Sequence, residues 1–254
     1  MDERAELVEE TIWEAFAAYR ASPTAMVVDT GTIRLGITGV GYAGLNGVFR
    51  AREMTPAAVG ETLRLFRQRG VSMLWHVGPQ SDPDLEPLLL AAGLEFDEEE
   101  PGMLAGLGAS TRAAAAPAGL RIEQVRDVDT LTRWVDVWSG GRLSEAAVRV
   151  RAALGLSESA LCQHLIGYSG DEAIATAAVY HGARASEVQH VVTLDAYRRR
   201  GIGTAMTAAA LELARRHGNR YAVLTSSPDG ERLYARLGFV AVCSVRRFLR
   251  RRAP

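Results

Sequence analysis

The stretch that decides the fold is VVTLDAYRRRGIGTAM, Val191–Met206. The run Glu187–Thr193 predicts a strand, and the Ala-, Leu- and Met-rich run Thr204–His217 predicts a helix. Between them lies the turn Arg198-Arg199-Arg200-Gly201-Ile202-Gly203-Thr204. Its glycines allow a ligand close to the backbone, and the first N–H groups of the helix are unpaired donors at the positive end of its dipole. The turn therefore predicts a pyrophosphate site, the alternative being a plain strand–helix turn with solvated arginines.

Two other phosphate-binding motifs do not fit this turn. The sequence contains no lysine, which excludes a P-loop, and a dinucleotide fingerprint would need a third glycine at Met206. A literal GxGxxG occurs at Gly39–Gly44, but Leu45–Arg50 after it predicts a strand rather than a helix. Arg64 stands about where that fingerprint needs an acidic residue. We interpret Gly39–Gly44 as a turn between strands.

A second motif, LYARLGF at Leu233–Phe239, follows one helix after the first. It belongs to a predicted helix, Pro228–Leu237, that has Ser227 as candidate N-cap and Gly238 at its end. The second half of the chain thus reads as an α+β order of elements. The other predicted elements are strands at 120–125, 163–168, 173–181, 221–225 and 239–247, and helices at 127–138 and 144–154.

Together the two motifs resemble those of the GNAT acetyltransferase superfamily, over residues 120–247. The resemblance implies a mixed, mostly antiparallel sheet flanked by helices, with acetyl-CoA as the acyl donor. It also implies that Arg198–Thr204 cradle the CoA pyrophosphate, that the main chain of Val191–Thr193 binds the pantetheine and acyl carbonyl, and that Tyr234 is the general acid. The expected cofactor-binding residues are Val191, Val192, Thr193, Arg198, Arg199, Arg200, Gly201, Ile202, Gly203, Thr204 and Ser227.

The chemistry of acyl transfer needs a base, a donor for the oxyanion and an acid for the thiolate. Tyr234 is the expected acid, and a strand amide near Val192 the expected oxyanion donor. Glu187 lies eleven residues before Arg198, where histone-acetylating members of the family carry their base, so it is the second predicted catalytic residue. The alternative for Glu187 is a strand-edge carboxylate paired with an arginine. Strict alternation places His190 on the opposite sheet face from Glu187, as a core histidine.

The tryptophans of the predicted helix 127–138 are the remaining site candidates. Trp134 and Trp138 are four residues apart and share one face of that helix. This spacing is typical of core packing. By the resemblance, helices of this region also line the acceptor cleft, so acceptor contact is the alternative.

The first half of the chain repeats the pattern of the second. Residues 48–96 follow the same order as residues 192–239: strand, basic turn, helix, Gly, short strand, Ser/Pro/Asp loop, helix, Gly and an aromatic residue. Matching Gly70 to Gly218 places Glu53 opposite Gly201 and Thr55 opposite Gly203. Matching Gly93 to Gly238 places Leu89 opposite Tyr234. We therefore expect two tandem GNAT-like domains: a degenerate, non-catalytic one at 1–116 and a catalytic one at 117–254, joined by the small-residue run 106–119.

Composition narrows the class of protein. The 254 residues are 48% hydrophobic and 23% charged, which is typical of soluble globular chains, and neither a signal peptide nor a membrane span is predicted. We therefore expect a cytoplasmic protein. The two cysteines, Cys162 and Cys243, lack metal or disulfide spacing, so no metal is expected. Residues 1–116 carry 17 acids against 9 arginines, whereas residues 117–254 carry 13 against 20, which suits an anionic ligand there.

These observations favour an N-acetyltransferase that moves an acetyl or other acyl group from acyl-CoA to an amine in a ternary complex. No Cys–His pair lies in the motif region, which speaks against a covalent acyl-enzyme. Small amines, amino acids, an antibiotic amine and a protein N-terminus all fit as acceptors, whereas nucleic acid and membrane are not expected partners. A homodimer is compatible with the sequence. The alternative is a catalytically silent CoA-binding sensor or interaction protein with the same fold.

Overall fold

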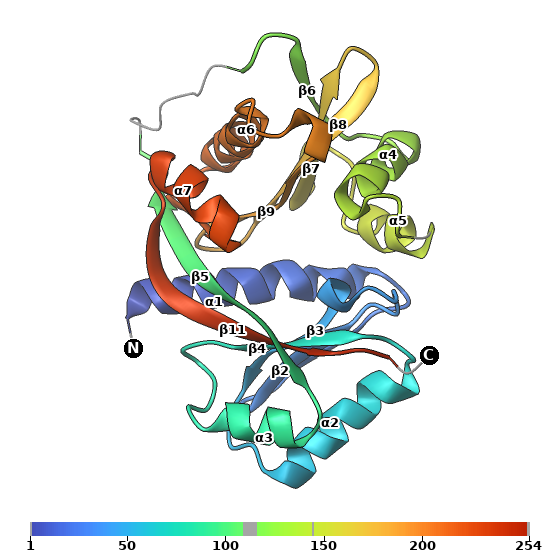
Figure 1. The fold of residues 1–254 in the computed structure, drawn as a ribbon, viewed down its shortest axis with the longest axis vertical. Helices are drawn as coiled ribbons and strands as arrows, with labels where there is room; N and C mark the ends of the chain where they lie inside the picture. The colour runs from blue at the N-terminus through green and yellow to red at the C-terminus, as the bar shows by residue number, and fades with distance from the viewer. Residues whose placement is uncertain (1, 109–115, 144, 253–254) are drawn as a thin grey trace. The chain divides into compact units, whose positions relative to one another are not determined.

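A computed structural model describes residues 2–108, 116–143 and 145–252 (Figure 1). The chain forms two compact units, each with a β-sheet and helices packed against it. Unit 1 is Met1–Gly102 together with Ala241–Pro254, and unit 2 is Met103–Val240. The elements predicted for the second half of the chain are present, with ends shifted by no more than three residues. Ser144, the predicted start of one helix, and residues 109–115 of the predicted linker lie outside the described residues.

This division differs from the expected boundary after residue 116, because the two units meet within two strands, β5 (Glu95–Gly106) and β11 (Val240–Arg250), rather than in the predicted linker. Strand β5 begins in unit 1, and its last residues, with Leu107, fill the core of unit 2. Strand β11 was expected to close the second domain. Instead it pairs antiparallel with β4 of unit 1, from Arg250↔Met73 to Arg246↔Val77.

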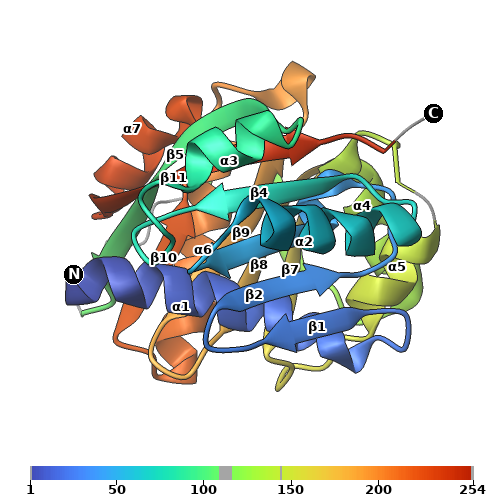
Figure 2. The same ribbon diagram turned by 90° about the horizontal axis from the view of Figure 1, so that it is seen from below.

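In unit 1 the strand order is β1-β2-β3-β4-β11-β5. Strands β3 and β4 are parallel, and the β1–β2, β2–β3 and β4–β11 pairs are antiparallel. Figure 1 shows α1 on one face of this sheet and α2 and α3 on the other, and in Figure 2 α2 runs in about the same direction as β2 and β4. The turn Gly39–Gly44 lies between β2 and β3, as predicted. The elements are α1 (Glu3–Ala17), β1 (Met26–Asp29), β2 (Ile33–Ile37), β3 (Asn46–Ala51), α2 (Pro56–Gln68), β4 (Met73–Val77) and α3 (Leu85–Ala91).

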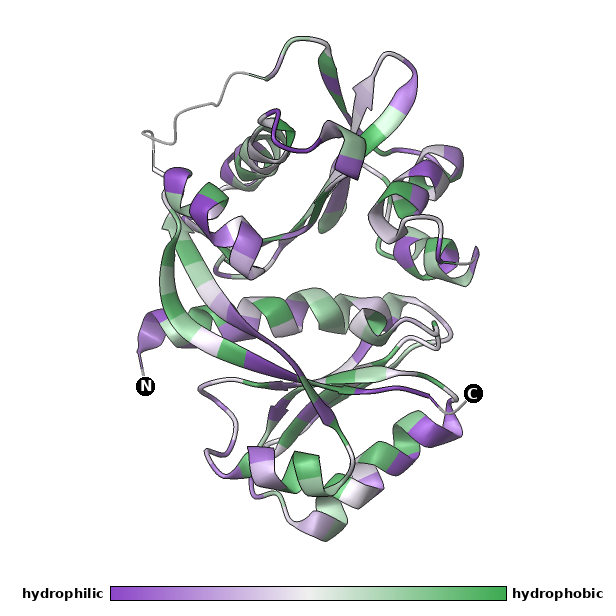
Figure 3. Ribbon diagram, in the orientation of Figure 1, coloured by the Kyte–Doolittle hydropathy of each residue, from purple (hydrophilic) through white to green (hydrophobic). Residues whose placement is uncertain are grey.

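In unit 2 the strand order is β5-β10-β9-β8-β7-β6, with β9 and β10 parallel and the pairs from β6 to β9 antiparallel. Helix α6 covers one sheet face, and α4 and α5 cover the other (Figure 1). The apolar side of α6 packs on the sheet through Met206, Ala210 and Ala214, and Figure 3 shows it in green. The elements are β6 (Leu120–Gln124), α4 (Val128–Ser139), α5 (Glu145–Ala152), β7 (Cys162–Ser169), β8 (Glu172–His181), β9 (Ser186–Thr193), α6 (Ile202–His217), β10 (Tyr221–Thr225) and α7 (Pro228–Arg236).

The internal repeat is present in the structure, but its predicted register is wrong by two residues at the turn. Helix α2 begins after its N-cap Thr55, and α6 begins after its N-cap Gly201. Thr55, rather than Glu53, therefore matches Gly201, and Ala57 matches Gly203. The closing glycine follows the start of the helix by 14 residues in α2 and by 16 in α6, and this length difference shifted the alignment.

At the second motif the predicted register is confirmed. The N–H of Leu94 donates to the carbonyl of Leu89 over 3.1 Å, and the N–H of Phe239 donates to the carbonyl of Tyr234 over the same distance. Both helices then end on a left-handed glycine, Gly93 and Gly238. Leu89 is fully buried, so the first copy has a core residue where the second has Tyr234.

Candidate active site

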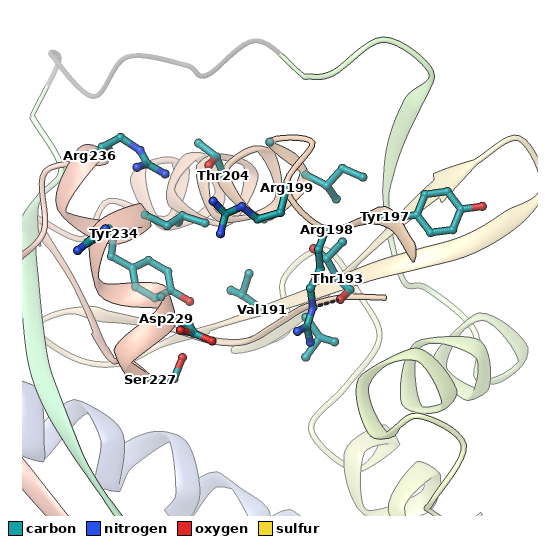
Figure 4. Close-up of a pocket in the computed structure, with 17 residues that line it drawn as sticks. Val191, Thr193, Tyr197, Arg198, Arg199, Thr204, Ser227, Asp229, Tyr234 and Arg236 are labelled. Carbon is teal, nitrogen blue, oxygen red and sulfur yellow. Dashed lines mark hydrogen bonds between the residues drawn. The ribbon is translucent and has the colours of Figure 1, made fainter. Parts of the chain in front are cut away.

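A pocket of about 690 Å³ lies in unit 2 where β9 ends, between the turn before α6 and helix α7 (Figure 4). It contains every predicted cofactor-binding residue except Arg200, and it contains Tyr234. Its lining residues are Val191, Val192, Thr193, Tyr197, Arg198, Arg199, Gly201, Ile202, Gly203, Thr204, Ser227, Asp229, Gly230, Arg232, Leu233, Tyr234 and Arg236.

The N-terminus of α6 is open toward this pocket. Its N-cap, Gly201, has no side chain to accept a hydrogen bond from the first turn, so the N–H groups there keep their capacity to bind a ligand. Gly201 has φ of 80°, a left-handed conformation that glycine adopts without strain. Gly203 gives room for a different reason, because a Cβ there would lie 3.2 Å from Cδ1 of Leu233 on α7, and the Leu233 side chain would have to shift.

The three arginines of the turn have different surroundings. Arg198 donates to the carbonyl of Thr193 over 3.2 Å and forms an ion pair with Asp195 at 3.0 Å. Arg200 donates to the carbonyl of Ala196 over 2.9 Å, and its guanidinium lies over the ring of Tyr197, which explains why it is outside the pocket lining. Arg199 lines the pocket and has φ of 64°.

Strand β9 carries a bulge beside the pocket. Gln189 pairs with Ala178 and Val192 pairs with Thr176, so His190 and Val191 together face the single residue between them on β8. His190 has φ of 54°. The pairing of β9 with β10 stops at Glu187↔Val223, so the main chain of β9 near Val191 is not paired with β10 and is available to a ligand at the pocket wall.

The bulge also reverses the alternation of side chains along β9, which corrects the predicted orientation of His190. Val188 and Val191 both pack toward α6, whereas the ring of His190 lies 4.6 Å from that of Trp138 on α4. His190 therefore shares the face of Glu187 instead of opposing it. The bulge was missed because it depends on the pairing of β9 with β8, and a single histidine does not mark it even though histidine is enriched at left-handed positions.

A buried cation, Arg151 of α5, lies at the centre of this face. Its guanidinium carbon is 4.3 Å from the ring centroid of Trp138 and 4.9 Å from that of Trp134, and its Nη2 donates to Nε2 of His190 over 2.7 Å. Burial and the charge of Arg151 hold the pKa of His190 well below its usual range, so the ring is neutral and accepts this bond. Trp134 is fully buried and donates to the carbonyls of Leu165 and Ala177, which confirms its core role.

Glu187 is not among the residues that line the pocket. It lies on β9, which is an inner strand, opposite Tyr180 and Val223, and it is buried. Burial raises the pKa of Glu187 to about 8, and the positive charge of Arg151 acts against that rise. The carboxyl group is thus neither at a strand edge nor in the pocket wall, and it takes up a proton near neutral pH.

Tyr234 reaches the pocket from α7. In Figure 4 its hydroxyl points toward Asp229 and Val191. The position is shaped by Gly230, where a Cβ would come within 2.9 Å of the Tyr234 ring. Its ring also packs against Phe239 with a centroid separation of 5.9 Å.

Several lining residues were not among the predicted site residues. They are Tyr197, Asp229, Gly230, Arg232, Leu233 and Arg236. Arg232 and Arg236 are separated by one helical turn, and this i,i+4 spacing in a helix next to an anion-binding turn is a signal that could have found them. The charged residues of the lining are four arginines and one aspartate, which favours an anionic ligand.

Comparison with known proteins agrees with this architecture. The family model of the Acetyltransferase (GNAT) domain matches residues 160–241. A search of curated proteins with this sequence finds no match. Among the described residues, there is no group of three or more His, Cys, Asp or Glu arranged to hold a metal ion. No helix in the part of the chain that the structure describes is long and apolar enough to cross a membrane.

Solved structures of similar fold span nearly the whole chain. A GCN5-related N-acetyltransferase from Kribbella flavida has a TM-score of 0.69 and 19% identity, over 96% of this chain and 95% of that one. One from Sphaerobacter thermophilus has a TM-score of 0.61 and 15% identity, over 91% and 76%. A tandem GNAT protein from the clavulanic acid biosynthesis pathway has a TM-score of 0.59 and 15% identity, over 98% and 96%. Residues 160–241 thus match the model of a GNAT acetyltransferase domain, and the chain has the fold of a tandem GNAT protein.

Proposed function

We propose that this protein is an N-acetyltransferase that moves an acetyl group from acetyl-CoA to an amine by direct transfer in a ternary complex. One observation carries the proposal: a single pocket joins an uncapped helix N-terminus, arginine side chains, the bulged strand β9 and a tyrosine hydroxyl. An anionic thioester with a long polar arm needs these features in one place.

Different pocket residues bind different parts of the acetyl-CoA molecule. The open N–H groups after Gly201, with Arg198 and Arg199, bind the pyrophosphate. The main chain of Val191–Thr193 pairs with the amide groups of the pantetheine arm as an added strand would, because the pairing of β9 with β10 stops at Glu187. Ser227 and Thr204 line the pocket and add hydroxyl groups to its wall.

The reaction then needs two proton transfers. The neutral amine attacks the thioester carbonyl, the oxyanion that forms is stabilised by a strand amide near Val192, and the C–S bond breaks. Tyr234 gives its proton to the departing thiolate. Glu187 accepts the proton lost by the amine through water, since it lies outside the pocket lining. Its raised pKa, about 8, suits a base that must receive a proton near neutral pH.

The first unit is the non-catalytic copy in this proposal. At the start of α2 the position of Gly201 is taken by Thr55, and the next residue is Pro56. The side chain of Thr55 accepts a hydrogen bond from the N–H of Ala58, and proline has no N–H, so the end of α2 offers few donors to an anion. Leu89 replaces Tyr234 in the same copy. We therefore expect one CoA site per chain.

The second candidate, a CoA-binding sensor, is favoured by one observation: Glu187 is buried beside Arg151 rather than placed in the pocket. One experiment distinguishes the acetyltransferase from the sensor. Release of free CoA is measured with a panel of amines and acetyl-, propionyl- and succinyl-CoA, alongside calorimetric titration with CoA. Binding at one site with amine-dependent CoA release supports the enzyme, whereas binding without release across the panel supports the sensor. No binding of CoA would contradict both.

A further inference from the structure

The pocket holds more positive charge than a pyrophosphate group requires. Arg198 is already paired with Asp195, while Arg199, Arg232 and Arg236 have no hydrogen bond or ion pair with any residue that the structure describes. Asp229 is the single acid in the lining. Arg232 and Arg236 lie on α7, outside the pyrophosphate-binding turn, so they are suited to a second anionic group of the ligand, and Arg199 of the turn can contribute to both groups.

Two of these arginines converge on one end of the pocket. Arg199 extends from the turn and Arg236 from α7, and in Figure 4 their side chains reach toward each other near Thr204. Tyr234 comes from the same helix as Arg236 but is two residues away, so the two side chains point in different directions. The hydroxyl of Tyr234 is directed toward Asp229 and Val191. The end with Arg199 and Arg236 is thus separate from the end where acyl transfer is proposed.

We propose that Arg236, together with Arg199, binds the 3′-phosphate of CoA and makes the site selective for CoA over its 3′-hydroxyl analogue, dephospho-CoA. This inference rests on the proposed function, because it assumes that CoA occupies the pocket. A 3′-phosphate adds about 1.5 to 2 negative charges near neutral pH, and a planar guanidinium donates two parallel hydrogen bonds to such a group. The remote position from Tyr234 makes an acyl carboxylate a poor match for Arg236.

The test compares the affinities of CoA and dephospho-CoA by calorimetry for the wild-type chain and for Arg236→Gln. The wild-type chain should bind CoA about tenfold more tightly than dephospho-CoA. Arg236→Gln should weaken CoA binding by about the same factor and leave dephospho-CoA binding unchanged, so that the preference disappears. Arg216→Gln is the matched control, since Arg216 lies at the far end of α6 and pairs with Glu212. Its preference should equal that of the wild-type chain.

The possible results distinguish failure of the 3′-phosphate site from failure of the proposed function. Equal affinity of the wild-type chain for both ligands would overturn this inference and leave the proposed function standing. A variant that loses affinity for both ligands alike would also overturn it, because Arg236 would then act on a group that the two ligands share. A wild-type chain that binds neither ligand would contradict the proposed function as well.

Discussion

The two copies of the fold differ most at the turn before their longer helix. In unit 1 the turn ends in Thr55 and Pro56, so the N-terminus of α2 is capped and has lost one N–H group. In unit 2 the turn ends in Gly201 and Ile202, so the N-terminus of α6 has no side-chain cap. The backbone before both helices is otherwise similar, because Glu53 and Arg199 are both left-handed and lie two residues before the N-cap. Capping a helix and binding an anion at it are alternative uses of the same N–H groups.

The same comparison extends to the residues proposed for chemistry. Leu89 occupies the position in unit 1 that Tyr234 occupies in unit 2. In the parallel strand pairs, Val48 pairs with Trp75 as Glu187 pairs with Val223, and Trp75 and Val223 both lie five residues after the closing glycine of their helix. Val48 and Leu89 are both fully buried. The first copy thus keeps the positions but fills them with core residues.

The largest expected effect comes from a substitution in the uncapped turn before α6. Gly203→Glu should lower the affinity for CoA by at least about 10³-fold, because like charges at a binding site cost several kcal/mol and because a Cβ at this position presses on Leu233. Ala57→Glu is the matched variant in unit 1 and should leave CoA affinity unchanged. Calorimetry with circular dichroism on both folded variants decides the matter. Equal affinities for the two variants would remove the pyrophosphate assignment.

The next largest effect concerns Tyr234 of α7, which has Leu89 as its counterpart on α3. Tyr234→Phe keeps the ring against Phe239 but removes the hydroxyl, so turnover should fall by about 10²–10⁴-fold with little change in CoA affinity. The control Tyr221→Phe removes an exposed hydroxyl of β10 outside the pocket and should have no effect. Turnover at the wild-type level in Tyr234→Phe would show that water or the acceptor protonates the thiolate.

A smaller effect, visible only as a function of pH, tests Glu187. A base works in its deprotonated form, so with an acceptor amine whose pKa is about 10, kcat/KM should rise as pH passes upward through about 8. Glu187→Gln should remove this inflection and lower kcat/KM by about 10²-fold above it. Identical profiles for the variant and the wild-type chain would leave Glu187 as a structural partner of Arg151.

The smallest expected effect comes from substitutions of Thr55, which caps α2 in unit 1. Thr55→Ala removes the cap of α2 and should destabilise the chain by about 1 kcal/mol, whereas Thr55→Gly should cost only a few tenths of that amount. Neither change should alter CoA affinity or stoichiometry, because Pro56 still lacks an N–H. Chemical denaturation and calorimetry provide both readouts. A second CoA site in Thr55→Gly would mean that capping alone had silenced the first copy.

Local sequence signals predicted most of the elements and both motifs of the site. The glycines at 201 and 203, the N-cap position Ser227 and the apolar periodicity act over a few residues, and the structure has them where expected, although the Ser227 side chain makes no capping hydrogen bond. Three features were missed or misplaced, two because they depend on non-local strand pairing and one because the two matched helices differ in length. The alternation of β11 is the same whichever sheet it joins, the bulge at His190 depends on its pairing with β8, and the register of α2 depends on helix length. Arg232 and Arg236 became site residues only when α7 was seen beside the turn.

The assignment of β11 to unit 1 has a consequence for biosynthesis. Unit 2 is one continuous segment, Met103–Val240, whereas unit 1 needs Ala241–Arg250 beside β4. A chain that emerges from the ribosome in order therefore completes the unit it began second before the unit it began first. Until the last residues appear, β4 presents an unpaired edge, which is a template for aggregation. A premature stop after Val240 would release a whole second unit attached to a first unit with an open sheet, so such truncated chains should be prone to aggregation or degradation.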